Sequence, residues 1–336
     1  MKKQVLALLA SVAACAAHAQ SNVTIFGSLD LNVTYSKVGS QHATGMDQGG
    51  YLLPSRIGFR GTEDLGGGWS TGFWLESAVL PDTGASQGAF FGRRSTVSLT
   101  SKTWGEVRLG RDYTPTFWNV SHFTPLGTVG VGGSSNIIEG WPLGLGAART
   151  QSRASNAVGY FLPRTLGGVY GQVMIAAGEK VEGARYEGGR IGYAAGPVNI
   201  AVAYGQTRMG IDDYKTATVG GTYDFGVVKA YVNYLQHRLG SDKQTNILIG
   251  AAVPVGGAGS IKASFARSNR SGSDADAQQL AIGYTYALSK RTTLYTAYSH
   301  IRNDGNAAYV TAPDLPPAGV PGRKAQGFQV GINQAF

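Results

Sequence analysis

The chain has 336 residues and a formal net charge of +9, and only 15% of its residues are charged, against about 25% in soluble domains. Its 50 glycines are about twice the usual share, but they follow no three-residue period, which excludes collagen. β-Branched and aromatic residues are plentiful, which excludes a disordered chain.

The first 19 residues have the three parts of a secretory signal peptide. A basic start, MKK, precedes a short apolar run, and Ala17-His18-Ala19 is a small-x-small cleavage site. The apolar run is too short to span a membrane as a helix, and a lipoprotein site at Cys15 is the less favoured alternative. Cleavage after Ala19 would remove the only cysteine and lower the net charge from +9 to +7. We expect residues 20–336 to form one domain without disulfides or cysteine metal sites.

The rest of the chain alternates between polar and apolar residues with a period of two, which predicts β-strands. No stretch after Ala19 has 18 consecutive apolar residues, so no transmembrane helix is expected. Most expected strands have 9–13 residues, about the length that a tilted strand needs to cross a bilayer. The sixteen expected strands are residues 22–36, 55–63, 69–80, 91–102, 105–113, 153–163, 168–179, 186–195, 198–209, 214–225, 227–239, 242–254, 260–270, 276–288, 292–303 and 325–336.

The connections between these strands alternate in length along the chain. Short turns such as 64–68 and 103–104 alternate with mostly longer loops such as 37–54, 81–90 and 114–152. Short turns at one end and long loops at the other predict an up-and-down antiparallel barrel that spans a membrane. A soluble β-sandwich is the alternative, but its loops would not sort by length in this way.

In a membrane barrel the apolar face of each strand meets lipid and the polar face meets the lumen. Ile57 and Phe59 therefore place Arg56 and Arg60 inside. A lipid-facing arginine at the bilayer midplane would cost roughly 2–4 kcal/mol, so inward placement of the arginines is favoured. The same parity sends further side chains inward, namely Arg94, Thr96, Ser98, Glu106, Arg108, Arg153, Ser155 and Ala157, followed by Arg190, Lys229 and Lys262.

Arg93 is the exception, because its parity points outward beside Val97 and Leu99. It lies at the loop-side end of its expected strand, where the cost of a charge facing lipid falls toward zero. We therefore expect Arg93 to face lipid or a neighbouring subunit at the rim, and Arg94 to face the water of the lumen.

The segment 114–152 has about 39 residues without a strong period, and its aromatic and isoleucine residues argue against disorder. A sixteen-stranded barrel is too wide for side chains to fill, so we expect this loop to fold inside and narrow the channel. Rings of arginine select anions. The candidate residues for the constriction and its anion selectivity are Arg56, Arg60, Arg94, Arg108 and Arg153 on the wall, and Arg149 and Glu139 on the loop. Glu106 could pair with Arg108 on the same face.

Four stretches carry a family resemblance: SNVTIFGSLDLNVTY after the signal, residues 55–77, residues 91–112, and GFQVGINQAF at 327–336. They resemble the trimeric sixteen-stranded outer-membrane porins of Gram-negative bacteria, and most closely the anion-selective porins of betaproteobacteria. The resemblance implies a homotrimer in the outer membrane, in contact with lipid and lipopolysaccharide, that passes small anionic solutes passively. It also implies that loop 81–90 latches onto a neighbour, and that Arg56, Arg94 and Arg153 set the anion preference.

Other functions fit the sequence less well. A barrel hydrolase would need a base beside a nucleophile, and the histidines form no such set with Ser and Asp. A substrate-specific channel for small carboxylates, phosphate or sugars remains open, because Phe117, Trp118 and Trp141 could stack on a sugar. No glycine-rich nucleotide motif stands between a strand and a helix, so neither a cofactor nor a nucleic-acid partner is expected.

Overall fold

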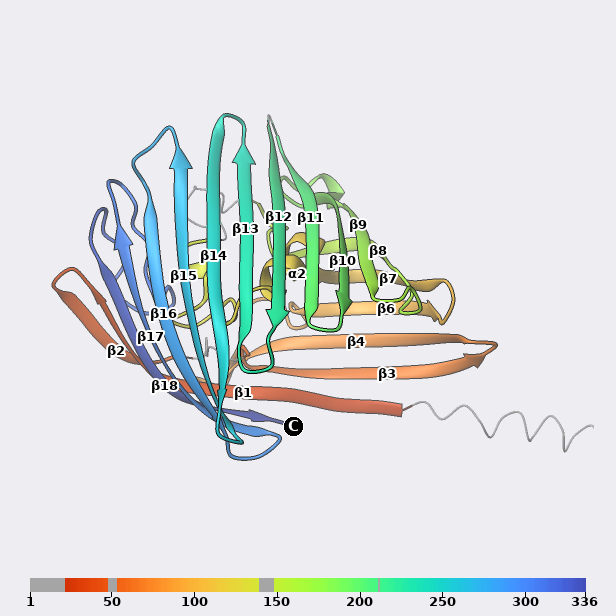
Figure 1. Ribbon diagram of the computed structural model, residues 1–336. Helices are drawn as coiled ribbons and strands as arrows, with labels where there is room; N and C mark the ends of the chain where they lie inside the picture. Colours follow the sequence, from red (N-terminus) through yellow and green to blue (C-terminus); the bar gives the residue numbers. More distant parts are fainter. Residues whose placement is uncertain (1–21, 48–52, 139–147, 211) are drawn as a thin grey trace, which may run out of the picture.

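The computed structural model describes residues 22–47, 53–138, 148–210 and 212–336, and Figure 1 shows its arrangement. The expected signal peptide and Glu139 lie outside the described residues. In the part described, sixteen strands form one closed antiparallel wall, because β18 at the end of the chain pairs with β1 at its start. The predicted sixteen-stranded antiparallel barrel is confirmed. The wall strands are β1 (Asn22–Val38), β3 (Arg56–Gly66), β4 (Trp69–Leu80), β6 (Arg94–Ser101), β7 (Gly105–Tyr113), β8 (Arg153–Phe161), β9 (Val169–Ala177), β10 (Arg185–Ala195), β11 (Val198–Met209), β12 (Asp212–Asp224), β13 (Lys229–Leu239), β14 (Asp242–Val255), β15 (Gly259–Ser271), β16 (Ala277–Ala287), β17 (Thr292–Asn303) and β18 (Ala325–Ala335).

Two further strands add to the wall at its loop-side end. β2 (Gln41–Asp47) pairs with the second half of β1, while β3 pairs with the first half. β5 (Ala85–Ser86) is a two-residue return onto the end of β4. Both lie in segments that the sequence predicts as loops.

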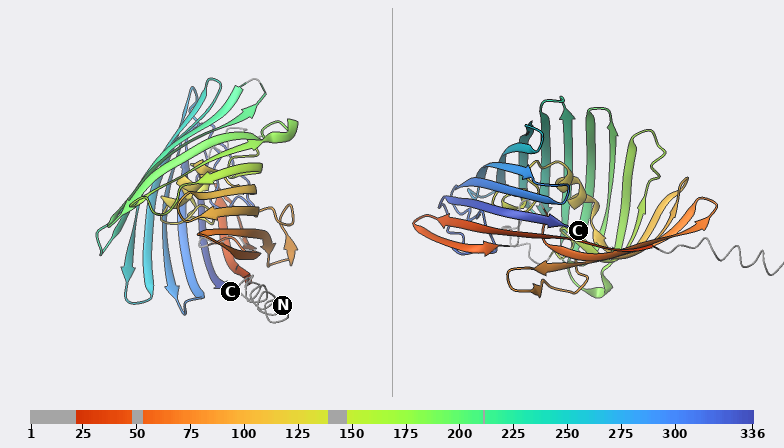
Figure 2. Two further views of the ribbon diagram at one scale, coloured as in Figure 1. Left: turned by 90° about the vertical axis from the view of Figure 1, so that its right-hand side faces the viewer. Right: turned by 90° about the horizontal axis from the view of Figure 1, so that it is seen from below.

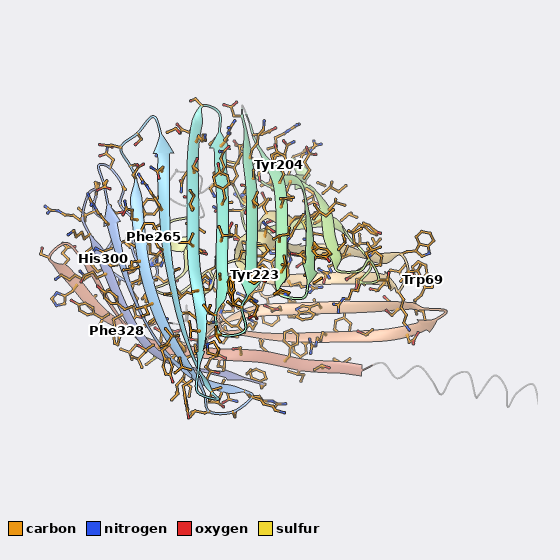
Figure 3. All side chains as sticks on the ribbon, in the orientation of Figure 1. Trp69, Tyr204, Tyr223, Phe265, His300 and Phe328 are labelled. Atoms are coloured by element: carbon orange, nitrogen blue, oxygen red, sulfur yellow. The ribbon has the colours of Figure 1, made fainter. Side chains whose placement is uncertain are left out.

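The outer face of the wall is apolar, as alternation predicts. On β14, Ile247 and Ile249 are 50% and 52% exposed, whereas Leu248 between them is only 2% exposed. Aromatic side chains share the outer face, including Tyr204, Tyr223, Phe265 and Phe328 (Figure 3). Such apolar exposure is expected where the surrounding medium is lipid.

The segment between β7 and β8 is called the inner loop below, and its described parts, residues 114–138 and 148–152, lie inside the ring of strands (Figure 2). Its helix α2 (Pro115–His122) starts with proline at the first turn, and the Thr114 side chain caps it by accepting a hydrogen bond from the Phe117 amide. The 3₁₀ turn η1 (Ser134–Asn136) follows within the inner loop, and η3 (Gly178–Lys180) lies between β9 and β10. Among the described residues, no helix is long and apolar enough to cross a membrane.

Inward-facing polar side chains hold the inner loop against the far wall. Asn233 Nδ2 donates to the Val120 carbonyl at 3.3 Å, and Gln244 Nε2 donates to the Ile137 carbonyl at 3.3 Å. Close approach also requires a small residue on the wall: a Cβ at Gly220 would lie 2.1 Å from the Phe123 ring. The loop is therefore docked on β12–β14, opposite the arginine-bearing strands.

Candidate pore-lining site

Glu76 is the first of two carboxylates around which the arginines of the site gather, and it is buried on the inner face of β4. Its Oε1 accepts hydrogen bonds from Arg56 Nη1 at 3.1 Å and from Arg93 Nε at 2.6 Å. Trp74 Nε1 donates to Oε2 of the same carboxylate at 3.1 Å. Two guanidinium groups thus share one negative charge.

Asp112 is the second of these carboxylates, and it lies at the loop-side end of β7. Arg108 Nη1 donates to its Oδ2, and Arg94 Nε lies 3.8 Å from the same atom. Arg108 also donates to both oxygens of Glu106, at 2.9 and 3.1 Å. Arg108 is therefore neutralised by two carboxylates, whereas Arg94 has a single distant one.

Arg153 and Arg60 have no carboxylate within ion-pair distance among the described residues. Arg153, the first residue of β8, donates to the Tyr113 hydroxyl at 2.5 Å and to the Arg93 carbonyl at 2.8 Å, and its guanidinium lies 4.1 Å from the Tyr113 ring centroid. Arg60 lies 5.1 Å from the Phe26 ring and 5.3 Å from the Trp74 ring. Aromatic faces attract cations by about 0.5–2 kcal/mol, so these rings orient charges that lack an acidic partner.

The charge balance of this region favours anions. The arginine cluster consists of Arg56, Arg60, Arg93, Arg94, Arg108 and Arg153, and it faces three carboxylates, Glu76, Glu106 and Asp112. Six cations against three anions leave a net charge of +3. Charges of one sign that line a channel with low-dielectric walls raise the local concentration of the opposite ion.

The structure brings most of the candidate residues together. Arg56, Arg94 and Arg153 lie at the loop-side ends of β3, β6 and β8, which are separated from one another by β4 and β7. Arg60 and Arg108 lie further toward the turns. Arg149 is not part of this group: its backbone N–H donates to the Gly183 carbonyl, and neighbouring Ala148 packs on Tyr214 of β12.

Two orientations inferred from parity are wrong. Arg93 faces Glu76 rather than lipid, because β6 begins at Arg94 and strand alternation does not extend to the residue before it. Ser155 lies on the outer face, where Arg111 Nη1 donates to its hydroxyl at 2.8 Å. The cause is a bulge at Asn156, whose φ of 54° is left-handed.

The sequence does not reveal Glu76 and Asp112 as the carboxylates that pair with these arginines. The signal for Glu76 lies in the sheet register, since Glu76 is directly opposite Arg94 on the next wall strand. Finding it would have required the pairing of the two strands as well as their parity.

A further arginine lies on β10, two strands beyond β8. Arg190 Nε donates to Asn119 Oδ1 of the inner loop at 3.0 Å, and its guanidinium lies 4.8 Å from the Tyr170 ring centroid. Desolvation inside the barrel lowers the pKa of His122, and the charges of Arg190 and Lys229 lower it further. His122 is therefore neutral at neutral pH, and the permanent charges come from arginine and lysine.

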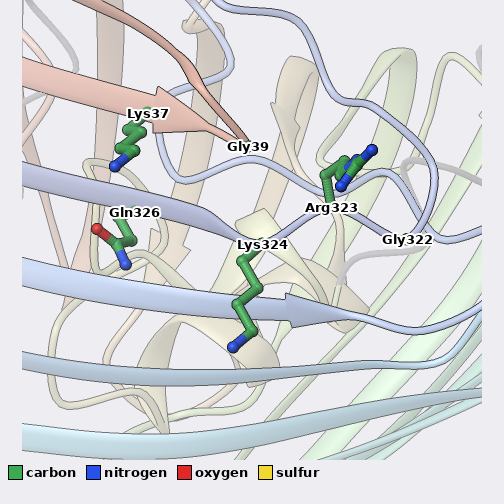
Figure 4. Close-up of a pocket in the computed structure, with 6 residues that line it drawn as sticks. All are labelled: Lys37, Gly39, Gly322, Arg323, Lys324 and Gln326. Carbon is green, nitrogen blue, oxygen red and sulfur yellow. The ribbon is translucent and has the colours of Figure 1, made fainter.

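The loop-side rim carries a hollow of about 320 Å³ between β1 and β18 (Figure 4). Lys37, Arg323 and Lys324 line it together with Gly39, Gly322 and Gln326, and none of these six residues is acidic. The lining of this hollow is therefore basic.

A family model described as Gram-negative porin matches residues 5–306. The chain belongs to the Gram-negative porin family. Outer membrane porin protein 32 of Delftia acidovorans is 37% identical over 355 aligned residues, covering all of both chains. An outer membrane porin protein of Bordetella pertussis is 29% identical and covers 90% of this chain and 95% of its own. Porins are passive, water-filled diffusion channels, so this protein is an outer-membrane channel and not an enzyme.

Solved structures agree with the family. The anion-selective porin from Comamonas acidovorans is 35% identical, covers 94% of this chain and 100% of its own, and superposes with a TM-score of 0.86. The trimer form of OmpT from Vibrio cholerae has a TM-score of 0.68 at 14% identity over 94% of this chain and 99% of its own, a likeness of fold alone.

Proposed function

We propose that this porin is a general diffusion channel for small hydrophilic solutes that prefers anions, and that the arginine cluster sets the preference. The observation that carries the proposal is the excess of six arginines over three carboxylates on the wall that faces the inner loop. The 35% identical porin from Comamonas acidovorans, which is anion-selective, supports it.

In this proposal selectivity is electrostatic, and the anion binds weakly enough to pass through the channel quickly. Arg94 Nε donates to the Thr96 hydroxyl at 3.0 Å, and its guanidinium lies 4.5 Å from the Trp74 ring, so the charge is held at the wall. A passing anion exchanges part of its hydration for guanidinium N–H groups. Conduction requires binding that is favourable enough to enter and weak enough to leave.

The inner loop narrows the channel at the level of the arginine cluster in this proposal. The described parts of the loop, residues 114–138 and 148–152, carry no acidic residue. These described parts of the loop add no negative charge to offset the positive field of the wall, and Glu139 lies outside the described residues.

The protein assembles as a homotrimer in the outer membrane in this proposal, with loop 81–90 reaching toward a neighbour. The trimer form of a porin of the same fold supports this. The apolar outer face contacts lipid and lipopolysaccharide, and small anions are the transported solutes.

The test is a reversal-potential measurement in planar bilayers under a KCl gradient. We expect anion over cation permeability, and a cation preference would reject the proposal. Conductance should rise linearly with added malonate or phosphate. Saturation at low millimolar concentration would instead identify a channel specific for small carboxylates, phosphate or sugars.

A further inference from the structure

The outer face of β12, β13 and β14 changes character in regular rows toward its loop-side end, where these strands lie side by side (Figure 1). Each row consists of three residues directly opposite one another on the three strands. The rows are apolar (Val219, Tyr234, Ile247), then neutral (Ala217, Gln236, Thr245), then basic (Lys215, Arg238, Lys243).

The three basic side chains point away from the lumen. Their chain neighbours His237 and Gln244 face inward, where their side chains hydrogen-bond the carbonyls of Ile138 and Ile137 in the inner loop. Successive strand residues point to opposite faces, so Arg238 and Lys243 face outward. Lys215 follows the buried Tyr214 and is itself exposed.

The protein does not neutralise this basic row. Among the described residues, none of the three cations is in an ion pair, whereas Asp213 lies 3.8 Å from Arg208 and Asp242 lies 3.1 Å from Arg270. Like charges directly opposite each other on adjacent strands are destabilising. An external anion would remove that repulsion.

The basic row lies at the height of lipid headgroups. Val219 and Ile247 in the apolar row are 52% and 50% exposed, as expected of lipid contacts. The basic row is four residues further along each strand, about 13 Å along the strand and about 10 Å along the membrane normal at a tilt of about 40°. Hydrogen bonds on β13 connect the basic, neutral and apolar rows: Arg238 Nε donates to Gln236 Oε1, and Gln236 Nε2 donates to the Tyr234 hydroxyl.

We propose that Lys215, Arg238 and Lys243 form a binding site for the phosphate group of an anionic lipid in the outer leaflet. Three adjacent cations can neutralise a phosphomonoester, whose charge is about −1.5 to −2 at pH 7, and guanidinium and ammonium groups both donate to its oxygens. The apolar rows below lie where the acyl chains of the same lipid would run. That continuity favours a lipid phosphate over a free phosphate ion.

The test uses the full mature protein, folded in neutral detergent, with bisphosphorylated lipid A as the probe. The variant K215Q/R238Q/K243Q removes the basic row, and K102Q/K290Q/R291Q removes three exposed cations from the short-turn end as a matched control. Affinity is measured at low salt by native mass spectrometry or thermophoresis. We expect the first variant to bind lipid A on the order of 10- to 100-fold more weakly and the control to bind like the parent.

The parent alone also tests the proposal. Its affinity for lipid A should fall as salt rises, dephosphorylated lipid A should bind weakly, and lipid A should raise the thermal unfolding temperature of the parent but not of the triple variant. Unchanged affinity of the variant, equal binding of dephosphorylated lipid A, or displacement of lipid A by low millimolar inorganic phosphate would each overturn it. An altered oligomer size with unchanged lipid affinity would assign the row to a protein contact instead. If the triple variant does not fold, the charge-preserving K215R/K243R must retain the parent affinity.

Discussion

Replacing Glu76 with glutamine tests whether the wall carboxylates limit anion selectivity. The change removes the negative charge that Arg56 and Arg93 share and raises the net charge of the arginine cluster from +3 to +4. For a monovalent ion that passes about 8 Å away, one charge is worth about 0.5 kcal/mol even at the dielectric constant of water. That energy raises anion occupancy about 2.3-fold and lowers cation occupancy about 2.3-fold, so the permeability ratio should rise about fivefold.

The same substitution should weaken the folded wall locally. Glu76 accepts three hydrogen bonds from side chains, and Arg93 is 9% exposed. A buried charged donor that loses its carboxylate costs about 1–3 kcal/mol, which should lower the thermal unfolding temperature of the protein.

The assay is the reversal potential under a KCl gradient, with E63Q as the control, because Glu63 is exposed near the turn-side end of β3. The control should behave like the parent. An unchanged or smaller anion-to-cation ratio in E76Q would refute the electrostatic account of the cluster.

Three further substitutions separate the contributions of wall, loop and histidine. Arg153→Gln should lower the anion-to-cation permeability ratio by about the same factor of five. Arg149 lies outside the arginine cluster, so Arg149→Gln should leave this ratio unchanged in the same recordings. Gly220→Val would drive a side chain into the aromatic ring of the inner loop, so single-channel conductance should change as the loop shifts; parental conductance would contradict the docking. Because the pKa of His122 is lowered, the ring gains its charge only in acid: His122→Ala should match the parent at pH 7 and above, and should lack any rise in anion preference as pH falls through the lowered pKa.

The sequence predicts the barrel well because each strand has one face toward lipid and one toward water. The two faces require apolar and polar residues to alternate with a period of two, and this pattern can be read from each strand alone. β2 escaped prediction because its sequence, QHATGMD, has little apolar alternation. It forms because β3 leaves β1 after Ser28, and the remaining edge of β1 needs a partner for its backbone N–H and C=O groups.

The site is harder to predict than the fold because it depends on register and on strand ends. Parity placed Arg56, Arg60, Arg94 and Arg108 on the correct face, each inside or at the start of a regular strand. It failed at Arg93, which lies outside its strand. Pairing of Glu76 with Arg56 and Arg93 joins residues 20 and 17 positions apart in the chain, and only the sheet register brings them together.

The stacked rings explain how a wall with few acids can hold exposed arginines in fixed positions. Trp74 lies beside both Arg60 and Arg94, and it also donates to Glu76. Carboxylates would hold the guanidinium groups as firmly, but they would cancel the charge that attracts anions. An aromatic face orients the cation and leaves its charge available.

Trp74→Leu tests whether anion selectivity depends on the fixed position of the guanidinium groups or on the net charge of the arginine cluster. All six arginines remain, so the anion-to-cation ratio should fall by less than in Arg94→Gln, which removes a charge. The freed Arg60 and Arg94 should move, so open-channel current noise should rise in single-channel recordings. Trp104→Leu is the control, because Trp104 is 70% exposed at a short turn. A loss of selectivity in Trp74→Leu as large as that in Arg94→Gln would mean that selectivity depends on the exact position of the guanidinium groups, and that the net charge of the cluster alone does not produce it.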